Sequence, residues 1–274
     1  MGRRNRSGAA GTIATQPESE DRKAGRAIEQ FHFVFCEVAA TELPLHDFAL
    51  KGGGNLRMFL RSRRRSRDLD LDFLGKDFDR FADRVDRLFA SRALGELLRV
   101  RDIRLVEPHR TKDTATVKRW KLALAAPGME DAPSKIEFSG RGTEREPALE
   151  RVDADLARRL RARPVMINHY PPRPAIEQKV TTLAMRSETQ PRDVFDLDHL
   201  FREYPDDLAQ ATLDSGVVRR AVARAWELKY DDYHRLVVEY LEEEFVLMYG
   251  SEEAWNEMLL RVTQQLEARG GAGR

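Results

Sequence analysis

The sequence predicts an α+β fold in which strands and helices share the N-terminal part and helices alone form the C-terminal part. Two observations predict it. Segments in which apolar and polar residues alternate, as in half-buried strands, recur between residues 48 and 170. From residue 174 onward, apolar residues recur every three or four positions, which is the period of amphipathic helices. We therefore expect a disordered tail over residues 1–22, a core of strands and helices over residues 23–172 and a helical domain over residues 173–269.

The core is expected to open with a helix over residues 23–41, because apolar residues recur there at helical steps and Pro44 follows. Further helices are expected over residues 78–99 and around residues 154–160. Alternation and flanking Pro and Gly residues predict strands over residues 68–73, 102–106, 114–124, 134–139 and 164–170.

The composition limits the functional class. The 274 residues include 47 Lys and Arg and 46 Asp and Glu, a balance that argues against a dedicated nucleic-acid coat protein but allows a local basic patch. A single cysteine, Cys36, excludes a disulfide within the chain and zinc sites built on cysteine pairs. No apolar run is long enough to span a bilayer, and the arginine-rich start has no apolar signal segment. We expect a soluble, cytoplasmic protein with no membrane partner.

The first candidate functional segment along the chain is a glycine turn. Gly52–Gly54 follows a short apolar run, and one or two helical turns are expected over residues 56–60. Glycine lets a phosphate approach the backbone, and the N-terminus of the following helix offers unpaired N–H groups. This turn therefore predicts a phosphate site.

Three acids follow at alternate positions of the next expected strand: Asp68, Asp70 and Asp72. Alternate side chains of a strand share a face, so these acids project together while Leu69 and Leu71 face the core. Neighbouring carboxylates repel one another unless a cation lies between them, and Mg²⁺ is usually bound by one or two carboxylates together with substrate phosphates. A phosphate site and an acid pair one short helix apart are what metal-assisted nucleotidyl transfer requires.

These residues resemble a known signature. Gly52-Gly53, a spacer and then Asp68-x-Asp70 resemble the DNA polymerase β-like nucleotidyltransferase superfamily. More narrowly, LKGG at residues 50–53 and RRSRDLD at residues 64–70 are similar to the AbiEii/MenT nucleotidyltransferase toxins. Gly54 is a mild departure, because relatives often have threonine there. The alternative is an ordinary loop followed by an acidic edge strand.

A second motif lies in the expected C-terminal helices. Asp193 and Asp196 are spaced i and i+3, so they project together from one helix. Lys179 followed by RDVFDL at residues 192–197 resembles the second motif of the same toxins. The resemblance implies that Lys179 contacts the nucleoside triphosphate and that Asp196 completes the site as its acidic partner. The alternative is an Arg/Asp ion-pair network that pins two helices together.

The resemblance implies a polymerase β-like nucleotidyltransferase core, a mixed sheet flanked by helices, followed by a C-terminal helical bundle. A third carboxylate commonly arrives on a neighbouring strand in this superfamily. Glu137 is the positional candidate, as a metal ligand or as the base that activates the attacking hydroxyl; the alternatives are a surface ion pair for Glu137, or Asp72 in its place. The expected catalytic residues are Asp68, Asp70, Lys179, Asp196 and Glu137, with Mg²⁺ held by Asp68 and Asp70. The expected nucleotide-binding residues are Lys51, Gly52, Gly53, Asn55, Arg64, Ser66 and Lys179.

Two groups of arginines allow more than one interpretation. Five arginines lie between residues 61 and 67; some must be solvated, and one or two are expected to hold the triphosphate or an acceptor backbone. Arg219, Arg220 and Arg224 either line a groove for RNA phosphates or, as is commoner, form a solvated helix face.

The function that the resemblance implies is that of a toxin in a toxin–antitoxin pair. Such an enzyme transfers a nucleoside monophosphate from a nucleoside triphosphate to the 3′ end of tRNA, which blocks translation, and a cognate antitoxin protein is its partner. The alternatives are nucleotidylation of a protein or small molecule, and a nucleotide-binding module without catalysis.

Overall fold

The computed structural model describes residues 20–142 and 145–270. Residues 1–19 of the expected tail therefore lie outside the described residues. The first helix, α1 (Glu20–Glu42), begins within the expected tail, so residues 20–22 are helical.

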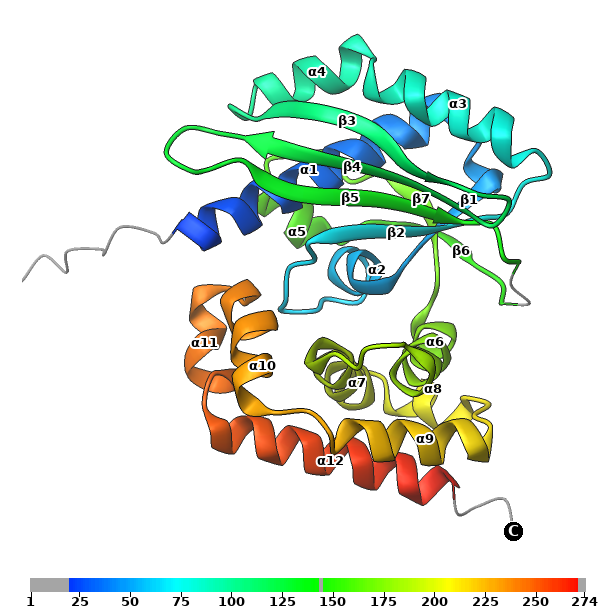
Figure 1. Ribbon diagram of the computed structural model, residues 1–274, viewed down its shortest axis with the longest axis vertical. Helices are drawn as coiled ribbons and strands as arrows, with labels where there is room; N and C mark the ends of the chain where they lie inside the picture. The colour runs from blue at the N-terminus through cyan, green and yellow to red at the C-terminus, as the bar shows by residue number, and fades with distance from the viewer. Residues whose placement is uncertain (1–19, 143–144, 271–274) are drawn as a thin grey trace, which may run out of the picture.

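A seven-stranded mixed sheet forms the centre of the N-terminal lobe, as predicted (Figure 1). The sheet runs antiparallel except where β2 lies beside β5 and where β1 lies beside β7. In spatial order its strands are β3 (Arg104–Asp113), β4 (Val117–Ala125), β5 (Ala132–Ser139), β2 (Asp68–Phe73), β1 (Phe48–Lys51), β7 (Met166–His169) and β6 (Ala148–Arg151). The edge strand β6 was not predicted, because its four residues lie in a charge-dense segment without clear alternation.

One face of the sheet is covered by α1, α3 (Phe78–Phe89) and α4 (Arg92–Arg99), whose apolar sides form a core with the inward residues of the strands (Figure 1). The short helix α5 (Ala154–Arg159) joins this core through Leu156. The expectation of one helix over residues 78–99 was wrong. The chain breaks at Ala90 and Ser91, and the Ser91 hydroxyl accepts a hydrogen bond from the Leu94 N–H at 3.3 Å, which caps the new helix.

Helices of the C-terminal lobe face the other side of the sheet, with α2 (Gly52–Met58) between them and the strands (Figure 1). They build a second core, which also takes in Leu56 and Leu60 from the region of α2. The predicted helical bundle is thus confirmed. Its helices are α6 (Pro172–Met185), α7 (Pro191–Glu203), α8 (Pro205–Gln210), α9 (Ser215–Ala225), α10 (Tyr230–Leu236), α11 (Glu243–Tyr249) and α12 (Glu252–Gly270), and short 3₁₀ helices span Leu45–Asp47 and Val238–Tyr240.

The loop between α2 and β2 is attached to this second lobe. The Arg65 N–H donates to the Tyr240 carbonyl at 3.0 Å. The guanidinium of Arg63 lies 4.7 Å from the centre of the Phe245 ring, where a cation is attracted to the ring face. The arginine-rich loop is therefore fixed by contacts to residues that follow it by about 175 positions or more.

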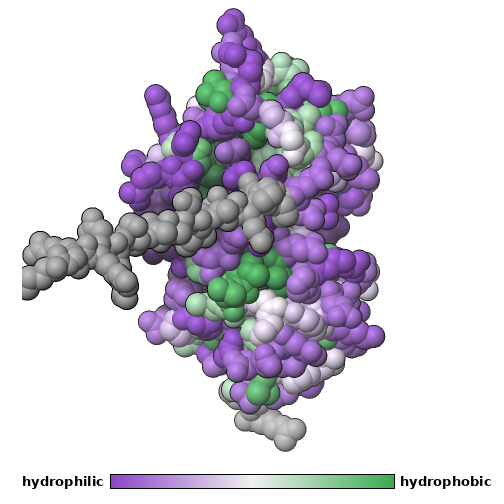
Figure 2. All heavy atoms as spheres, turned by 90° about the vertical axis from the view of Figure 1, so that its left-hand side faces the viewer, coloured by the Kyte–Doolittle hydropathy of each residue, from purple (hydrophilic) through white to green (hydrophobic). Residues whose placement is uncertain are grey.

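The surface of both lobes is mainly hydrophilic in the view of Figure 2, which also shows an apolar patch on the C-terminal lobe. On α11, Leu247 is 97% exposed and Met248 is 60% exposed. None of the described helices combines the length and the apolar character that crossing a membrane would need.

Candidate active site

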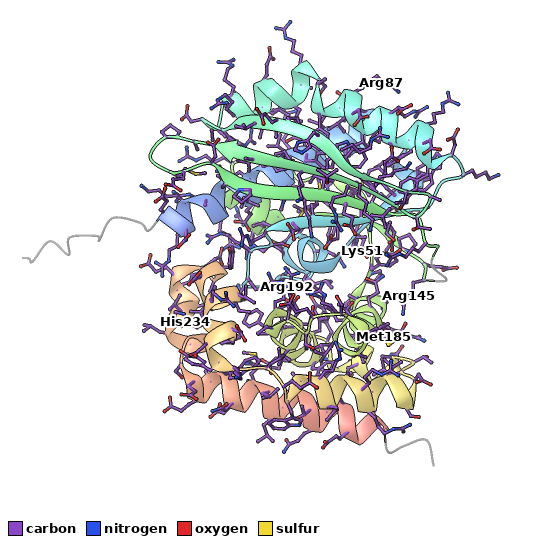
Figure 3. The ribbon with its side chains drawn as sticks, in the orientation of Figure 1. Lys51, Arg87, Arg145, Met185, Arg192 and His234 are labelled. Atoms are coloured by element: carbon purple, nitrogen blue, oxygen red, sulfur yellow. The ribbon has the colours of Figure 1, made fainter. Side chains whose placement is uncertain are left out.

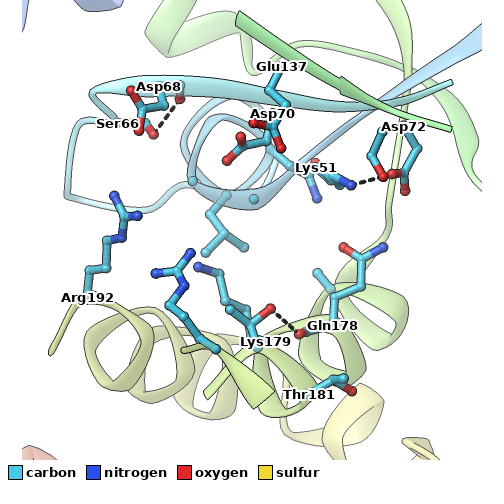
Figure 4. Close-up of a pocket in the computed structure, with 18 of the residues that line it drawn as sticks. Lys51, Ser66, Asp68, Asp70, Asp72, Glu137, Gln178, Lys179, Thr181 and Arg192 are labelled. Atoms are coloured by element: carbon cyan, nitrogen blue, oxygen red, sulfur yellow. Dashed lines mark hydrogen bonds and ion pairs between the residues drawn. The ribbon is translucent and has the colours of Figure 1, made fainter. Parts of the chain in front are cut away.

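A cavity of about 530 Å³ lies between the sheet and the C-terminal helices. One wall is formed by α2 and the strands β1, β2 and β5, and the other by α6 and the start of α7 (Figure 4). Nearly all the residues predicted for the site line this cavity: Lys51, Gly52, Gly53, Asn55, Arg64, Ser66, Asp68, Asp70, Glu137 and Lys179. The structure thus brings together two motifs that lie more than 100 residues apart in the sequence.

The glycines form the first turn of α2 itself, which corrects the expectation of a turn followed by a helix over residues 56–60. Gly52 has φ of +64°, in the left-handed region that favours glycine. A Cβ at Gly53 would lie 2.7 Å from the Ser66 hydroxyl, closer than real contacts allow. The glycine pair therefore lets the start of the helix lie directly against the acidic strand.

The sheet wall presents one row of charged residues across neighbouring strands. Lys51 pairs with Asp70 in the β1–β2 register, Asp70 with Glu137 between β2 and β5, and Glu137 with Arg119 between β5 and β4. Opposed residues of neighbouring strands point to the same face, so these four side chains share one side of the sheet. Leu69, on the opposite face of β2, is fully buried, as the alternation predicted.

Three of the four carboxylates on this wall already have a cation partner. Lys51 pairs with Asp72, which also accepts a hydrogen bond from the Tyr170 hydroxyl at 2.8 Å. The remaining pairs are Lys135 with Asp68 at 3.1 Å and Arg119 with Glu137 Oε2 at 2.5 Å. Across residues 20–142 and 145–270, no cationic side chain lies within ion-pair distance of Asp70. Asp70 is therefore the open carboxylate of the wall.

This donor set fits Mg²⁺ shared with a substrate. Within the described part of the chain, no three His, Cys, Asp or Glu side chains gather into a cage that could hold a metal by protein ligands alone. Mg²⁺ does not require such a cage, because it usually keeps several waters and binds one or two carboxylates together with phosphates. Asp68 and Asp70, two positions apart on β2 and both facing the cavity, supply such a pair.

The helix wall is organised by buried acids. Lys179 on α6 places its Nζ 2.5 Å from Asp196 Oδ2 and 3.1 Å from Asp193 Oδ1. Arg64 Nη2 lies 3.1 Å from the same Asp196 carboxylate. Burial alone would raise the pKa of Asp196, but the charges and hydrogen bonds of Arg64 and Lys179 outweigh it and hold the pKa at about 2. The carboxylate therefore stays ionised and keeps both cations in place.

Asp196 does not line the cavity; it lies behind Lys179 and Arg64, which do. The ion-pair interpretation of the second motif is thus correct, and the contact of Lys179 with a nucleoside triphosphate stays a prediction. An ion-pair network does join α6 to α7, and its cations face the cavity. Arg186 extends it with a contact of 3.2 Å to Asp193.

Two predicted nucleotide-binding side chains are engaged within the protein. Asn55 is 1% exposed; its amide N–H donates to the Tyr170 carbonyl at 2.7 Å, and its oxygen lies 2.9 Å from His169 Nδ1. The Ser66 hydroxyl donates to the Asp68 carbonyl at 2.8 Å. Both residues border the cavity, and their polar side-chain groups are engaged in hydrogen bonds within the protein.

Several cavity residues were not among the predicted site residues. Figure 4 shows Arg192 pointing from the start of α7 toward Ser66 and Asp68, and Gln178 pointing from α6 toward Lys51. Gln178 adjoins Lys179, and Arg192 begins the RDVFDL segment, so both lay beside recognised motif residues. Proximity to those residues was the available signal.

A family model described as "Nucleotidyl transferase AbiEii toxin, Type IV TA system" matches residues 36–269. No curated protein matches the chain.

Three solved structures share the fold. The first is described as a putative nucleotidyltransferase from H. pylori, with a TM-score of 0.55 at 18% identity, covering 93% of this chain and 97% of that one. JHP933 from Helicobacter pylori has a TM-score of 0.53 at 20% identity, covering 90% and 95%. The nucleotidyltransferase toxin MenT4 from Mycobacterium tuberculosis H37Rv has a TM-score of 0.52 at 17% identity, covering 91% and 86%. Likeness at these identities establishes a common fold.

Proposed function

We propose, from the premise that this chain belongs to the AbiEii family of nucleotidyl transferase toxins of type IV toxin–antitoxin systems, that it transfers a nucleoside monophosphate from a nucleoside triphosphate to the 3′ end of tRNA and so blocks translation. The observation that carries the proposal is the open carboxylate of Asp70 facing the cation of Lys179 across one cavity. Family membership further implies a cognate antitoxin as partner. Both substrates occur in the cytoplasm, where we propose that the enzyme acts.

The triphosphate is held by positive groups that are already in place. Lys179 and Arg64 are fixed by Asp196, and the start of α2 brings the Gly52 and Gly53 backbone to the cavity. Charges that are oriented before the substrate arrives need little reorganisation as negative charge develops on the phosphates. Lys179 thus stabilises the charge that moves onto the leaving pyrophosphate.

Asp68 and Asp70 would hold Mg²⁺, which when bound supplies charge neutralisation and polarises the phosphoryl group. Glu137 lies opposite Asp70 on the neighbouring strand, and only its Oε2 is taken up by Arg119. We propose that the other oxygen, Oε1, accepts the proton of the attacking acceptor hydroxyl as a general base.

The test is to incubate the protein with each labelled nucleoside triphosphate, Mg²⁺ and total tRNA, and to follow the label. We expect label in tRNA with the wild type. We expect Asp70→Asn to lower kcat/KM at least about 1,000-fold while the melting temperature is retained, because a metal-binding carboxylate contributes several kcal/mol to the transition state.

The matched control is Asp131→Asn, which removes one exposed carboxylate outside the cavity and should leave transfer unchanged. Activity of Asp70→Asn within tenfold of the wild type would contradict the assignment of the acid pair. Label in protein or a small molecule would favour nucleotidylation of those acceptors, and nucleotide binding without transfer would favour a binding module.

A further inference from the structure

Four arginines of α7 and α9, at or near the cavity, have no acidic partner among the described residues. Around them, Arg64 is paired with Asp196 and Arg186 with Asp193. We call these four residues the arginine track: Arg192, Arg219, Arg220 and Arg224. Within the described ranges, no carboxylate lies within ion-pair distance of any of them. The track is therefore a local excess of positive charge in a chain that is nearly neutral as a whole.

The track is continuous with the cavity. Arg192 lines the cavity from the start of α7 (Figures 3 and 4). Arg224 donates to the backbone carbonyl of Arg186, whose side chain also lines the cavity, and lies 3.3 Å from the Thr189 hydroxyl. One turn earlier on α9, Arg220 lies 2.7 Å from the Met185 sulfur, where α6 ends. Positive charge thus leads from inside the cavity, over the end of α6, onto α9.

The spacing on α9 suits a chain of phosphates. Arg220 and Arg224 are four residues apart, so they lie on one helix face about 6 Å apart along the axis. Arg219, beside them, is exposed. Guanidinium groups bind phosphate through two parallel hydrogen bonds, which makes arginine the cation best suited to a nucleic-acid backbone. The exposed acids Glu188 and Glu227 lie near these arginines in the sequence, and within the described ranges neither forms an ion pair with them.

The geometry points to the arginine track as the binding site for the backbone phosphates of a single-stranded RNA 3′ end, which it guides so that the terminal hydroxyl enters the cavity beside Glu137. This inference rests on the proposed function, since it places the acceptor of that reaction. A cavity of about 530 Å³ has room for a triphosphate and the end of one strand, whereas a duplex, whose major groove alone is about 12 Å wide, would remain outside.

The test measures RNA binding apart from transfer. A tRNA transcript with a 5′ fluorescein is titrated with the full chain, wild type or Arg220→Gln/Arg224→Gln, at several salt concentrations, and anisotropy gives Kd. We expect Kd to rise about tenfold or more in the double variant. We also expect the slope of log Kd against log salt to fall by about 1.4, because each phosphate contact to a single strand contributes about 0.7. Binding of a nucleoside triphosphate, titrated without RNA, should not change.

Two matched variants control for charge and folding. Arg80→Gln/Arg87→Gln removes the same charge from exposed positions of α3, on the far side of the sheet (Figure 3), and should bind tRNA as the wild type does. Arg220→Lys/Arg224→Lys keeps the charge but not the two parallel hydrogen bonds, so its Kd should lie between those of the wild type and the double glutamine variant.

The inference is overturned if the double glutamine variant binds tRNA as tightly as the wild type, if the wild type does not bind tRNA, or if triphosphate binding is lost to the same extent. Label transfer separates this inference from the proposed function. RNA bound through Arg220 and Arg224 without nucleotide transfer would leave the track in place and remove the proposed reaction. Transfer to tRNA with an unchanged KM for tRNA in the double variant would support the proposed reaction and remove the role of the track.

Discussion

The two walls of the cavity arrange their charges in opposite ways. On the sheet wall the carboxylates face the cavity, and the side chains of Asp68 and Glu137 are each 22% exposed. On the helix wall the carboxylates are hidden, since Asp193 is 1% exposed and Asp196 0%, and the cations that they hold face the cavity instead.

This difference separates two uses of an ion pair. A buried carboxylate with two cations is part of the fold, because removing one partner leaves uncompensated charge in a low-dielectric interior. A partly exposed carboxylate remains solvated when its partner leaves, so it is free to exchange one cation for another. The helix wall therefore holds its cationic side chains in fixed positions, whereas the carboxylates of the sheet wall are open to bind a cation.

Among substitutions that test this difference between the walls, Asp196→Asn is expected to cause the largest loss of stability. The substitution leaves Arg64, which is 4% exposed, and Lys179 short of a counter-charge, so we expect the free energy of unfolding to fall by about 3–5 kcal/mol. Urea unfolding followed by circular dichroism measures it.

The matched control is Asp198→Asn on the same helix. Asp198 is also buried, but its partners Arg261 and Arg202 are 42% and 51% exposed and stay solvated without it. We expect its loss to be about half as large or less. Equal losses in the two variants would mean that the solvation of the partners does not decide the cost.

A smaller effect is expected from His32, a buried polar group that has no counter-charge. Its Nε2 lies 3.0 Å from the Ser134 hydroxyl, and burial lowers its pKa from 6.5 to about 3. The unfolded chain binds a proton below pH 6.5 whereas the folded chain does not until about pH 3, so this residue costs stability as pH falls through that window.

Between pH 6.5 and 4.5 we expect the wild type to lose about 2 kcal/mol more unfolding free energy than His32→Gln, which cannot be protonated there. Urea unfolding at a series of pH values in both proteins gives the difference. Parallel pH profiles for the two would show that His32 takes up its proton without cost.

The smallest effect is expected at the sheet wall. Lys135→Gln removes the partner of Asp68, but these two side chains are 30% and 22% exposed, so the free energy of unfolding should change by less than about 1 kcal/mol. Thermal melts and urea unfolding measure it. A loss approaching that of Asp196→Asn would erase the contrast between the walls.

Local sequence patterns were sufficient to predict the parts of the fold that repeat over short distances. The acid strand, with alternate residues buried, and the pair of aspartates on α7 both depend on spacings of two or three residues. The mixed sheet and the meeting of the glycine and lysine motifs came from the resemblance to a family, since periodicity does not specify which distant segments pair.

Contacts between distant residues account for what was missed. Arg57 is buried against Glu29 of α1 and reaches Glu242 at 2.7 Å, 185 positions later in the chain. All five arginines between residues 61 and 67 also contact residues that are distant in the sequence. Within the described chain, only Arg64 of these five lines the cavity. The break between α3 and α4 depends on one serine cap within an otherwise helical pattern, which periodicity alone does not reveal.

The attachment of the loop over residues 59–67 to Tyr240 and Phe245 has a consequence for truncated and chimaeric forms of the protein. A gene cut after residue 236 would still encode every amino acid of both motifs, yet its product would lack the residues that brace the segment leading into the acid strand. A chimaera that takes only the first lobe from a relative would therefore have to keep the contact between positions 63 and 245 across the junction.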